Sequence, residues 1–93
     1  MFKWLNKQGV ESDAGFVVQF TGRFTCEYRE EGRILEIEVE DGLIGDKPCI
    51  NIKRNAFAYW NSGTPISPDL QAKMLQNFKD AMEFQGLKLI IFP

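Results

Sequence analysis

The segment from Ser67 to Gly86 constrains the fold most, because it has the pattern of one amphipathic α-helix with both ends marked. Its apolar residues recur at three- and four-residue spacing and therefore share one face: Leu70, Met74, Leu75, Phe78, Ala81 and Met82. Ser67 suits the N-cap, Pro68 suits the first helical position, and Gly86 can adopt the left-handed conformation that ends a helix. A single helix with an apolar stripe needs a sheet to pack on, so the sequence predicts an α+β fold.

A β-hairpin is predicted between residues 23–28 and 34–40, because both segments alternate apolar and polar side chains. A two-residue turn at Glu31-Gly32 and a four-residue loop over residues 30–33 give the same register. On the inner face this register pairs Phe24 with Val39, Cys26 with Ile37, and Tyr28 with Leu35. On the outer face it pairs Arg23 with Glu40 and Thr25 with Glu38. A three-residue loop would place Cys26 opposite Glu36, and the apolar pattern rejects that register.

Other segments complete one sheet. Residues 16–20 are predicted to form the strand before the hairpin, with a bulge or bend at Gly22. Residues 49–53 are predicted to form a further strand of the core sheet, with Ile50 and Ile52 inward. Residues 87–92 have one polar side chain and are predicted to form a strand that rejoins the sheet and is covered on both sides for part of its length. Its orientation stays open.

Turns and a short helical segment join these elements. Asp41-Gly42 and residues 45–48 are predicted to be turns, and residues 55–60 a helical turn. At the N-terminus, the apolar residues Phe2, Trp4 and Leu5 either dock on the body or fray. Together the patterns predict a single domain over residues 1–93. It is a mainly antiparallel sheet of four or five strands with one long C-terminal helix on one face and a final short strand.

The composition narrows the chemistry. The 93 residues include no His, which removes the commonest general base and metal ligand. Two cysteines, Cys26 and Cys49, make no disulfide framework and are expected to be core residues with reduced thiols. The first residues hold no apolar run long enough for a signal peptide or membrane span. We therefore expect a cytoplasmic protein that is not an enzyme and has no cofactor or metal site.

Acidic residues are concentrated in one block. Residues 27–46 hold eight acids and two bases, a balance of −6, although the whole chain carries only −2. Such a block repels phosphate and attracts basic protein surfaces. Glu36, Glu38 and Glu40 alternate on the outward face of the predicted hairpin. They form either an ordinary solvated face or a surface for a protein partner. Metal binding is less favoured because the carboxylates do not converge on one ion. Catalysis is less favoured because an acid pair needs one buried carboxyl, which an alternating polar face does not promise.

Tyr59 and Trp60 precede a loop and allow two interpretations. Trp60 either fills the edge of the core under the helix or, with Tyr59, anchors a partner, since exposed Tyr and Trp dominate interface hot spots. The loop itself, residues 61–64, has no phosphate-binding pattern, and Ser62 has no His to activate it. A plain connecting loop is predicted there.

From Tyr28 onward the chain resembles the bacterial polymorphic-toxin immunity proteins, most closely the immunity protein 74 family. The resemblance rests on the acidic hairpin REEGRILEIEVE, the strand CINIK followed by a segment that ends at Trp60, and a loop through Thr64-Pro65-Ile66-Ser67 into a helix. The closing segment LQNFKDAMEFQGLKLIIF, with its aliphatic helix, Gly and short apolar strand, is also similar. These features cover about two thirds of the chain.

The resemblance implies a small cytoplasmic inhibitor that binds the C-terminal domain of a cognate toxin and occludes its active or substrate site. A monomer that forms a heterodimer with the toxin is expected, without nucleic acid or membrane as partner. The candidate contact residues are Glu27, Glu30, Glu31, Glu36, Glu38, Glu40, Asp41, Tyr59 and Trp60. The alternative is a non-catalytic adaptor or binding subunit of a larger assembly, which would use the sheet edge or the helix.

Overall fold

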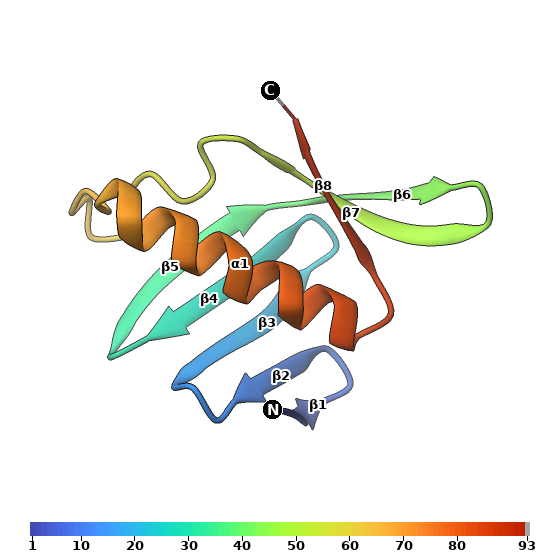
Figure 1. Ribbon diagram of the computed structural model, residues 1–93, viewed down its shortest axis with the longest axis horizontal. Coiled ribbons are helices and arrows are strands. Elements are labelled where there is room, and N and C mark those ends of the chain that lie inside the picture. The colour runs from blue at the N-terminus through green and yellow to red at the C-terminus, as the bar shows by residue number, and fades with distance from the viewer. Residues whose placement is uncertain (93) are drawn as a thin grey trace.

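The protein is described by a computed structural model over residues 1–92, and these residues form two β-sheets and one α-helix (Figure 1). Five consecutive antiparallel strands make the first sheet: β1 (Phe2–Asn6), β2 (Gly9–Ser12), β3 (Phe16–Gly22), β4 (Thr25–Glu30) and β5 (Arg33–Glu38). Three strands make the second sheet: β6 (Glu40–Ile44), β7 (Lys47–Lys53) and β8 (Lys88–Phe92). The helix α1 (Pro68–Phe84) crosses one face of the first sheet. The predicted α+β fold is confirmed.

The helix α1 begins and ends where its sequence signals predict. The hydroxyl of Ser67 accepts a hydrogen bond from the backbone N–H of Leu70 at 3.3 Å, and Pro68 occupies the first turn. Gly86, with φ of 80°, follows the C-cap residue Gln85. The face toward the sheet buries the predicted stripe, of which Met74, Phe78, Ala81 and Met82 are inaccessible to solvent.

The β4–β5 hairpin has the predicted register. Cys26 pairs with Ile37, Tyr28 with Leu35, and Thr25 with Glu38. The connection is the two-residue turn Glu31-Gly32, in which both residues have positive φ, 53° and 76°. Two positive φ angles are typical of the type I′ turn, whose twist matches that of the flanking strands. The alternation of apolar residues was therefore sufficient to establish this pairing.

The start of β4 differs from the prediction. Gly22 pairs with Thr25, so Arg23 and Phe24 form a two-residue turn between β3 and β4, and the register shifts between Phe20 and Gly22. The bulge expected at Gly22 is thus confirmed, but the inward placement of Phe24 is wrong: its side chain is 55% exposed. A residue in a tight turn is freed from the alternation of the strand, which explains the difference. Only a backbone bond, from Val39 N–H to the Phe24 carbonyl, joins the predicted pair.

The chain leaves the first sheet at Val39, and three predictions fail there. Asp41 and Gly42 lie inside β6, not in a turn, so the predicted pair of Arg23 with Glu40 does not form. The second predicted turn, over residues 45–48, is confirmed at Gly45-Asp46, between paired Ile44 and Lys47, although Lys47 and Pro48 already belong to β7. Residues 49–53 belong to β7 of the second sheet, although Ile50 and Ile52 are buried as predicted.

The last strand, β8, does not rejoin the first sheet. It pairs with β7 in parallel, with Ile50 opposite Leu89 and Lys53 opposite Phe92. Its end is open to solvent, since Phe92 is 40% exposed, so the expected cover on both sides does not extend to Ile91 and Phe92. A parallel neighbour requires a long crossover connection, and the segment that contains α1 supplies it.

The N-terminal segment belongs to the first sheet and does not fray. The first twelve residues add β1 and β2 to the sheet, and Phe2 packs against Phe16 and Phe84 with ring centroids 5.7 and 5.5 Å apart. Trp4 and Leu5 stay exposed.

Residues 54–58 form hydrogen-bonded turns instead of the predicted helical turn. Among the described residues, no helix has the length and apolar character needed to cross a membrane.

Candidate protein-binding surface

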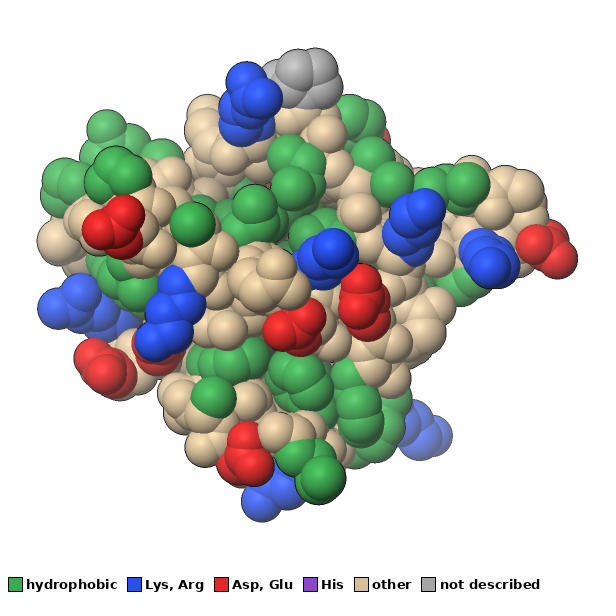
Figure 2. All heavy atoms as spheres, in the orientation of Figure 1, with side chains coloured by type: hydrophobic (Ala, Val, Ile, Leu, Met, Phe, Trp, Pro, Cys, Tyr) green, Lys and Arg blue, Asp and Glu red, His purple; other side chains and the backbone are tan. Residues whose placement is uncertain are grey.

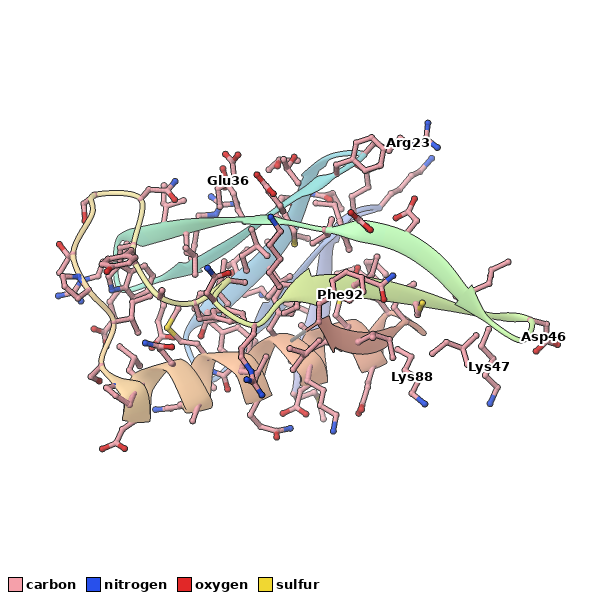
Figure 3. The ribbon with its side chains drawn as sticks, turned by 90° about the horizontal axis from the view of Figure 1, so that it is seen from above. Arg23, Glu36, Asp46, Lys47, Lys88 and Phe92 are labelled. Carbon is pink, nitrogen blue, oxygen red and sulfur yellow. The ribbon has the colours of Figure 1, made fainter. Side chains whose placement is uncertain are left out.

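The open face of the five-stranded sheet lies opposite α1 and is not covered by it. Strand alternation puts Glu27, Glu36 and Glu38 on this face, because their neighbours Cys26, Tyr28 and Ile37 are buried on the other. Figure 3 shows Glu36 pointing away from α1. The outward placement predicted for Glu36 and Glu38 agrees with this geometry.

The register brings two carboxylates directly together. Glu27 of β4 pairs with Glu36 of β5, and like charges in a cross-strand pair are destabilising. Arg29, on the same strand as Glu27, relieves part of this repulsion, with 3.5 Å between its Nε and Glu27 Oε1. Within residues 1–92 Glu36 makes no salt bridge. The centre of the open face therefore holds a carboxylate without a cationic partner.

Glu30 and Glu31 do not extend the row of carboxylates on the two strands of the open face. Glu30 is half-buried on the α1 side, where its carboxylate accepts a hydrogen bond from the Tyr28 hydroxyl. Asn77 of α1 donates to the same hydroxyl at 2.9 Å. Burial, reinforced by the bond to Glu30, raises the pKa of Tyr28. Glu30 thus takes part in an internal polar contact, and Glu31 occupies the β4–β5 turn.

The predicted row of Glu36, Glu38 and Glu40 is broken at Val39. Glu36 and Glu38 lie on β5, whereas Glu40 and Asp41 lie on β6 in the second sheet. Lys53 of β7 reaches Glu38 with 3.8 Å between Nζ and Oε2, and both side chains are well exposed. An exposed pair of this kind contributes little to stability. The acidic block is therefore distributed over the open face, the hairpin turn and the second sheet.

Tyr59 and Trp60 lie in different environments, one exposed and the other buried. Trp60 is 5% exposed and belongs to the core, and the guanidinium of Arg33 lies 5.7 Å from the ring centroid. Its buried Nε1 has no hydrogen-bond partner within residues 1–92. The core alternative for Trp60 is therefore correct, and its side chain is not available to a partner. Tyr59 is 60% exposed and stays a candidate.

Asn61 has a role that the sequence did not indicate. Its backbone N–H donates to the Ile34 carbonyl at 3.0 Å, and its Oδ1 accepts from the Glu36 N–H at 2.8 Å. Both groups belong to the outer edge of β5, so one residue occupies two hydrogen-bonding positions of an edge strand. Blocking an edge in this way protects a sheet from unwanted pairing. The predicted plain loop is therefore a cover for β5.

A cleft of about 620 Å³ lies where the two sheets meet. It is lined by residues from the β3–β4 turn and from β4 to β8: Arg23, Phe24, Thr25, Glu38, Val39, Glu40, Asp41, Asn51, Lys53 and Phe92. The sequence does not reveal this cleft, because the residues that line it are far apart in the chain. The one available signal was Gly22, which could have marked a turn that exposes Phe24.

The two cysteines and the acidic side chains were the remaining candidates for reactive or metal-binding groups. Cys26 and Cys49 are free and buried, as predicted. Burial, with a smaller effect of Glu27, raises the pKa of the Cys26 thiol to about 12, so this thiol stays protonated at neutral pH. Within residues 1–92 no group of three or more His, Cys, Asp or Glu side chains is placed to hold a metal ion.

The structure defines a small α+β protein with one sheet face covered by a helix and the other face open and acid-bearing. Comparison with known proteins adds no assignment: no family model, curated protein or solved structure matches the chain.

Proposed function

We propose that the protein is an immunity protein that binds a cognate toxin domain through the open face of its first sheet and blocks the toxin's active or substrate site. The observation that carries this proposal is the Glu27–Glu36 pair on an uncovered face. Glu38 extends the acidic surface by one more outward position along β5.

The pair supports binding for a physical reason. Two carboxylates side by side repel each other in the free protein, and a Lys or Arg from a partner would remove that repulsion and gain charge-assisted hydrogen bonds. Toxins that act on nucleic acids or nucleotide cofactors often have basic clefts. An acidic face would accelerate association with such a cleft and specify its orientation. Occlusion needs no catalytic group on the inhibitor.

Co-expression tests the function itself. The C-terminal domain of the large protein encoded beside this gene would be expressed with and without this chain, and surviving cells would be counted. We expect rescue together with a co-purifying one-to-one complex. Rescue without a complex would indicate an enzyme that reverses damage, and the absence of both toxicity and rescue would contradict the immunity proposal.

Charge reversal tests the site. The double variant Glu36→Lys, Glu38→Lys should weaken toxin binding more than tenfold and reduce its dependence on salt, because attraction to a basic cleft is replaced by repulsion. Glu83→Lys is the matched control, since Glu83 is exposed on α1, away from the open face. Equal effects of the two variants on affinity and salt dependence would contradict binding through the open face.

An adaptor function is the second candidate, and a different surface favours it. Trp4 and Leu5 of the edge strand β1 and Phe84 at the end of α1 are exposed, with the Trp4 and Phe84 ring centroids 5.8 Å apart. Figure 2 shows apolar side chains gathered where β1 meets the end of α1. Exposed aromatic patches mark interaction sites. A stable, non-toxic partner whose binding is lost on Trp4→Ala would establish this function.

A further inference from the structure

The cleft between the two sheets combines aromatic and acidic groups. Phe24 enters from the β3–β4 turn and Phe92 from β8, and both rings are substantially exposed. Figure 3 labels Phe92 on the last strand and Arg23, which forms the β3–β4 turn together with Phe24. Glu38 and Glu40 line the cleft from the two sides of Val39. Large exposed rings around a concave site are typical of binding surfaces.

The charges in the cleft favour a cation. Glu38, Glu40 and Asp41 contribute three carboxylates, against the two cations of Arg23 and Lys53. Lys53 is already paired with Glu38. Glu40 and Asp41 make no salt bridge within residues 1–92. An anionic ligand would be repelled, and a purely apolar ligand would leave these carboxylates without a partner.

A cation already lies on one of the two aromatic rings of the cleft. The guanidinium of Arg23 lies 5.2 Å from the centroid of the Phe24 ring, a cation–π contact. Arg is also the cation that binds carboxylates through two parallel hydrogen bonds and stacks on aromatic faces. A second guanidinium between Phe92 and Glu40 would combine both modes of contact.

We propose that this cleft binds an arginine side chain of a partner protein, flanked in that partner by an apolar residue that contacts Phe24 or Phe92. The proposal rests on the proposed function only in that the ligand belongs to a protein. It adds an anchoring point at the end of the acidic open face, since Glu38 belongs to both surfaces.

Peptide titration tests the cleft without the toxin. Acetyl-Phe-Arg-Phe-amide would be added to ¹⁵N-labelled protein, with acetyl-Phe-Gln-Phe-amide as the uncharged match, and amide shifts would be followed by NMR. We expect binding in the millimolar range, shifts at Phe24, Glu40 and Phe92, and about fivefold weaker binding of the Gln peptide. Equal affinity of the two peptides, no binding up to about 10 mM, or shifts confined to the open face would overturn the proposal.

Variants locate the contact. Phe24→Ala with Phe92→Ala should weaken binding of the Arg peptide about fivefold, and Glu40→Gln should abolish the preference for Arg over Gln. These side chains are exposed, so the urea midpoint should stay unchanged. Leu43→Ala is the matched control, because Leu43 is an exposed apolar residue of the second sheet outside the cleft. A cleft variant that binds like this control would overturn the assignment.

The toxin complex separates this inference from the proposed function. If the toxin domain binds and the Phe24, Phe92 double variant binds it equally well, the cleft is not an anchor although immunity stands. If no toxin domain binds but the Arg peptide shows the expected selectivity, the immunity proposal fails and the arginine site stands.

Discussion

The two sheets of this protein are stabilised in different ways. The first sheet packs its apolar face on α1, and Tyr28, Ile37 and Phe78 meet there with almost no exposed surface. The second sheet projects from this body, as the β6–β7 hairpin in Figure 1 shows. Its strand β7 buries Ile50 and Ile52, but β6 has Leu43 72% exposed.

This difference shows that an apolar segment can form a strand without becoming buried. Both sheets contain β-branched and aliphatic runs, but α1 crosses one face of the first sheet and contacts the second sheet at β8. Far along the hairpin, apolar residues such as Leu43 and Ile44 have no covering element and stay at the surface. We therefore expect mutations under α1 to act on the whole fold and mutations at the hairpin end to act locally.

The largest effect should come from the interface of α1 with the first sheet. Phe78→Ala removes a side chain that is fully buried and packs edge-on against Phe57, with ring centroids 5.7 Å apart. The free energy of unfolding should fall by about 3–5 kcal/mol. Urea denaturation measures it, and Leu43→Ala, at the exposed hairpin end, should cost less than about 0.5 kcal/mol. Similar losses for the two variants would erase the distinction between the sheets.

A second substitution tests whether β7 unfolds cooperatively with the core between α1 and the first sheet. Ile52 is 1% exposed and lies in the core cluster with residues of the first sheet. Ile52→Ala should lower the free energy of unfolding by about 2–4 kcal/mol, with one transition by both circular dichroism and tryptophan fluorescence. Two separated transitions would mean that the second sheet unfolds on its own.

The comparison also shows why the sequence predicted one sheet well and the other poorly. The register of β4 and β5 follows from alternating apolar residues, because a shift by one residue would expose all of them. The same alternation continues through Val39, which is buried, so nothing in the pattern marks the change of sheet at that residue. The strands β1 and β2 were missed because the alternation of Phe2, Lys3 and Trp4 stops at Leu5, and residues 9–12 contain only one large apolar side chain.

The candidate surface was predictable only in part. The outward direction of Glu36 and Glu38 is a local property of a strand, and the sequence showed it. The Tyr28 hydroxyl that donates to Glu30 also accepts a hydrogen bond from Asn77, which lies 49 positions away from Tyr28 and becomes a neighbour only when α1 docks. The cleft likewise needs residues that are far apart in the chain, Arg23 and Phe92 among them.

A smaller effect is expected where α1 meets β4 through polar atoms. Tyr28→Phe keeps the buried ring, which stacks on Phe16, but removes the hydroxyl shared by Glu30 and Asn77. Both partners would then lose a hydrogen bond in a partly buried site, which should cost about 2 kcal/mol. Urea denaturation measures the change. Tyr59→Phe removes the same hydroxyl from an exposed ring and should have no effect; an equal loss in both would contradict a structural role for the contact.

The smallest effect concerns the turns of the two hairpins. In the β4–β5 turn a non-Gly residue, Glu31, has φ of 53°, whereas in the β6–β7 turn the positive φ of 64° falls on Gly45. A side chain with a Cβ is strained in that region, and Asn tolerates it better than other non-Gly residues. Glu31→Asn should therefore stabilise the protein by about 0.5 kcal/mol, measured by urea denaturation. Glu31→Gln removes the same charge without easing the backbone and should not stabilise. If the Gln variant is stabilised as much as the Asn variant, the stabilisation comes from removing a negative charge near Glu30. The backbone of the β4–β5 turn would then not be strained, and the two hairpin turns would not differ in this respect.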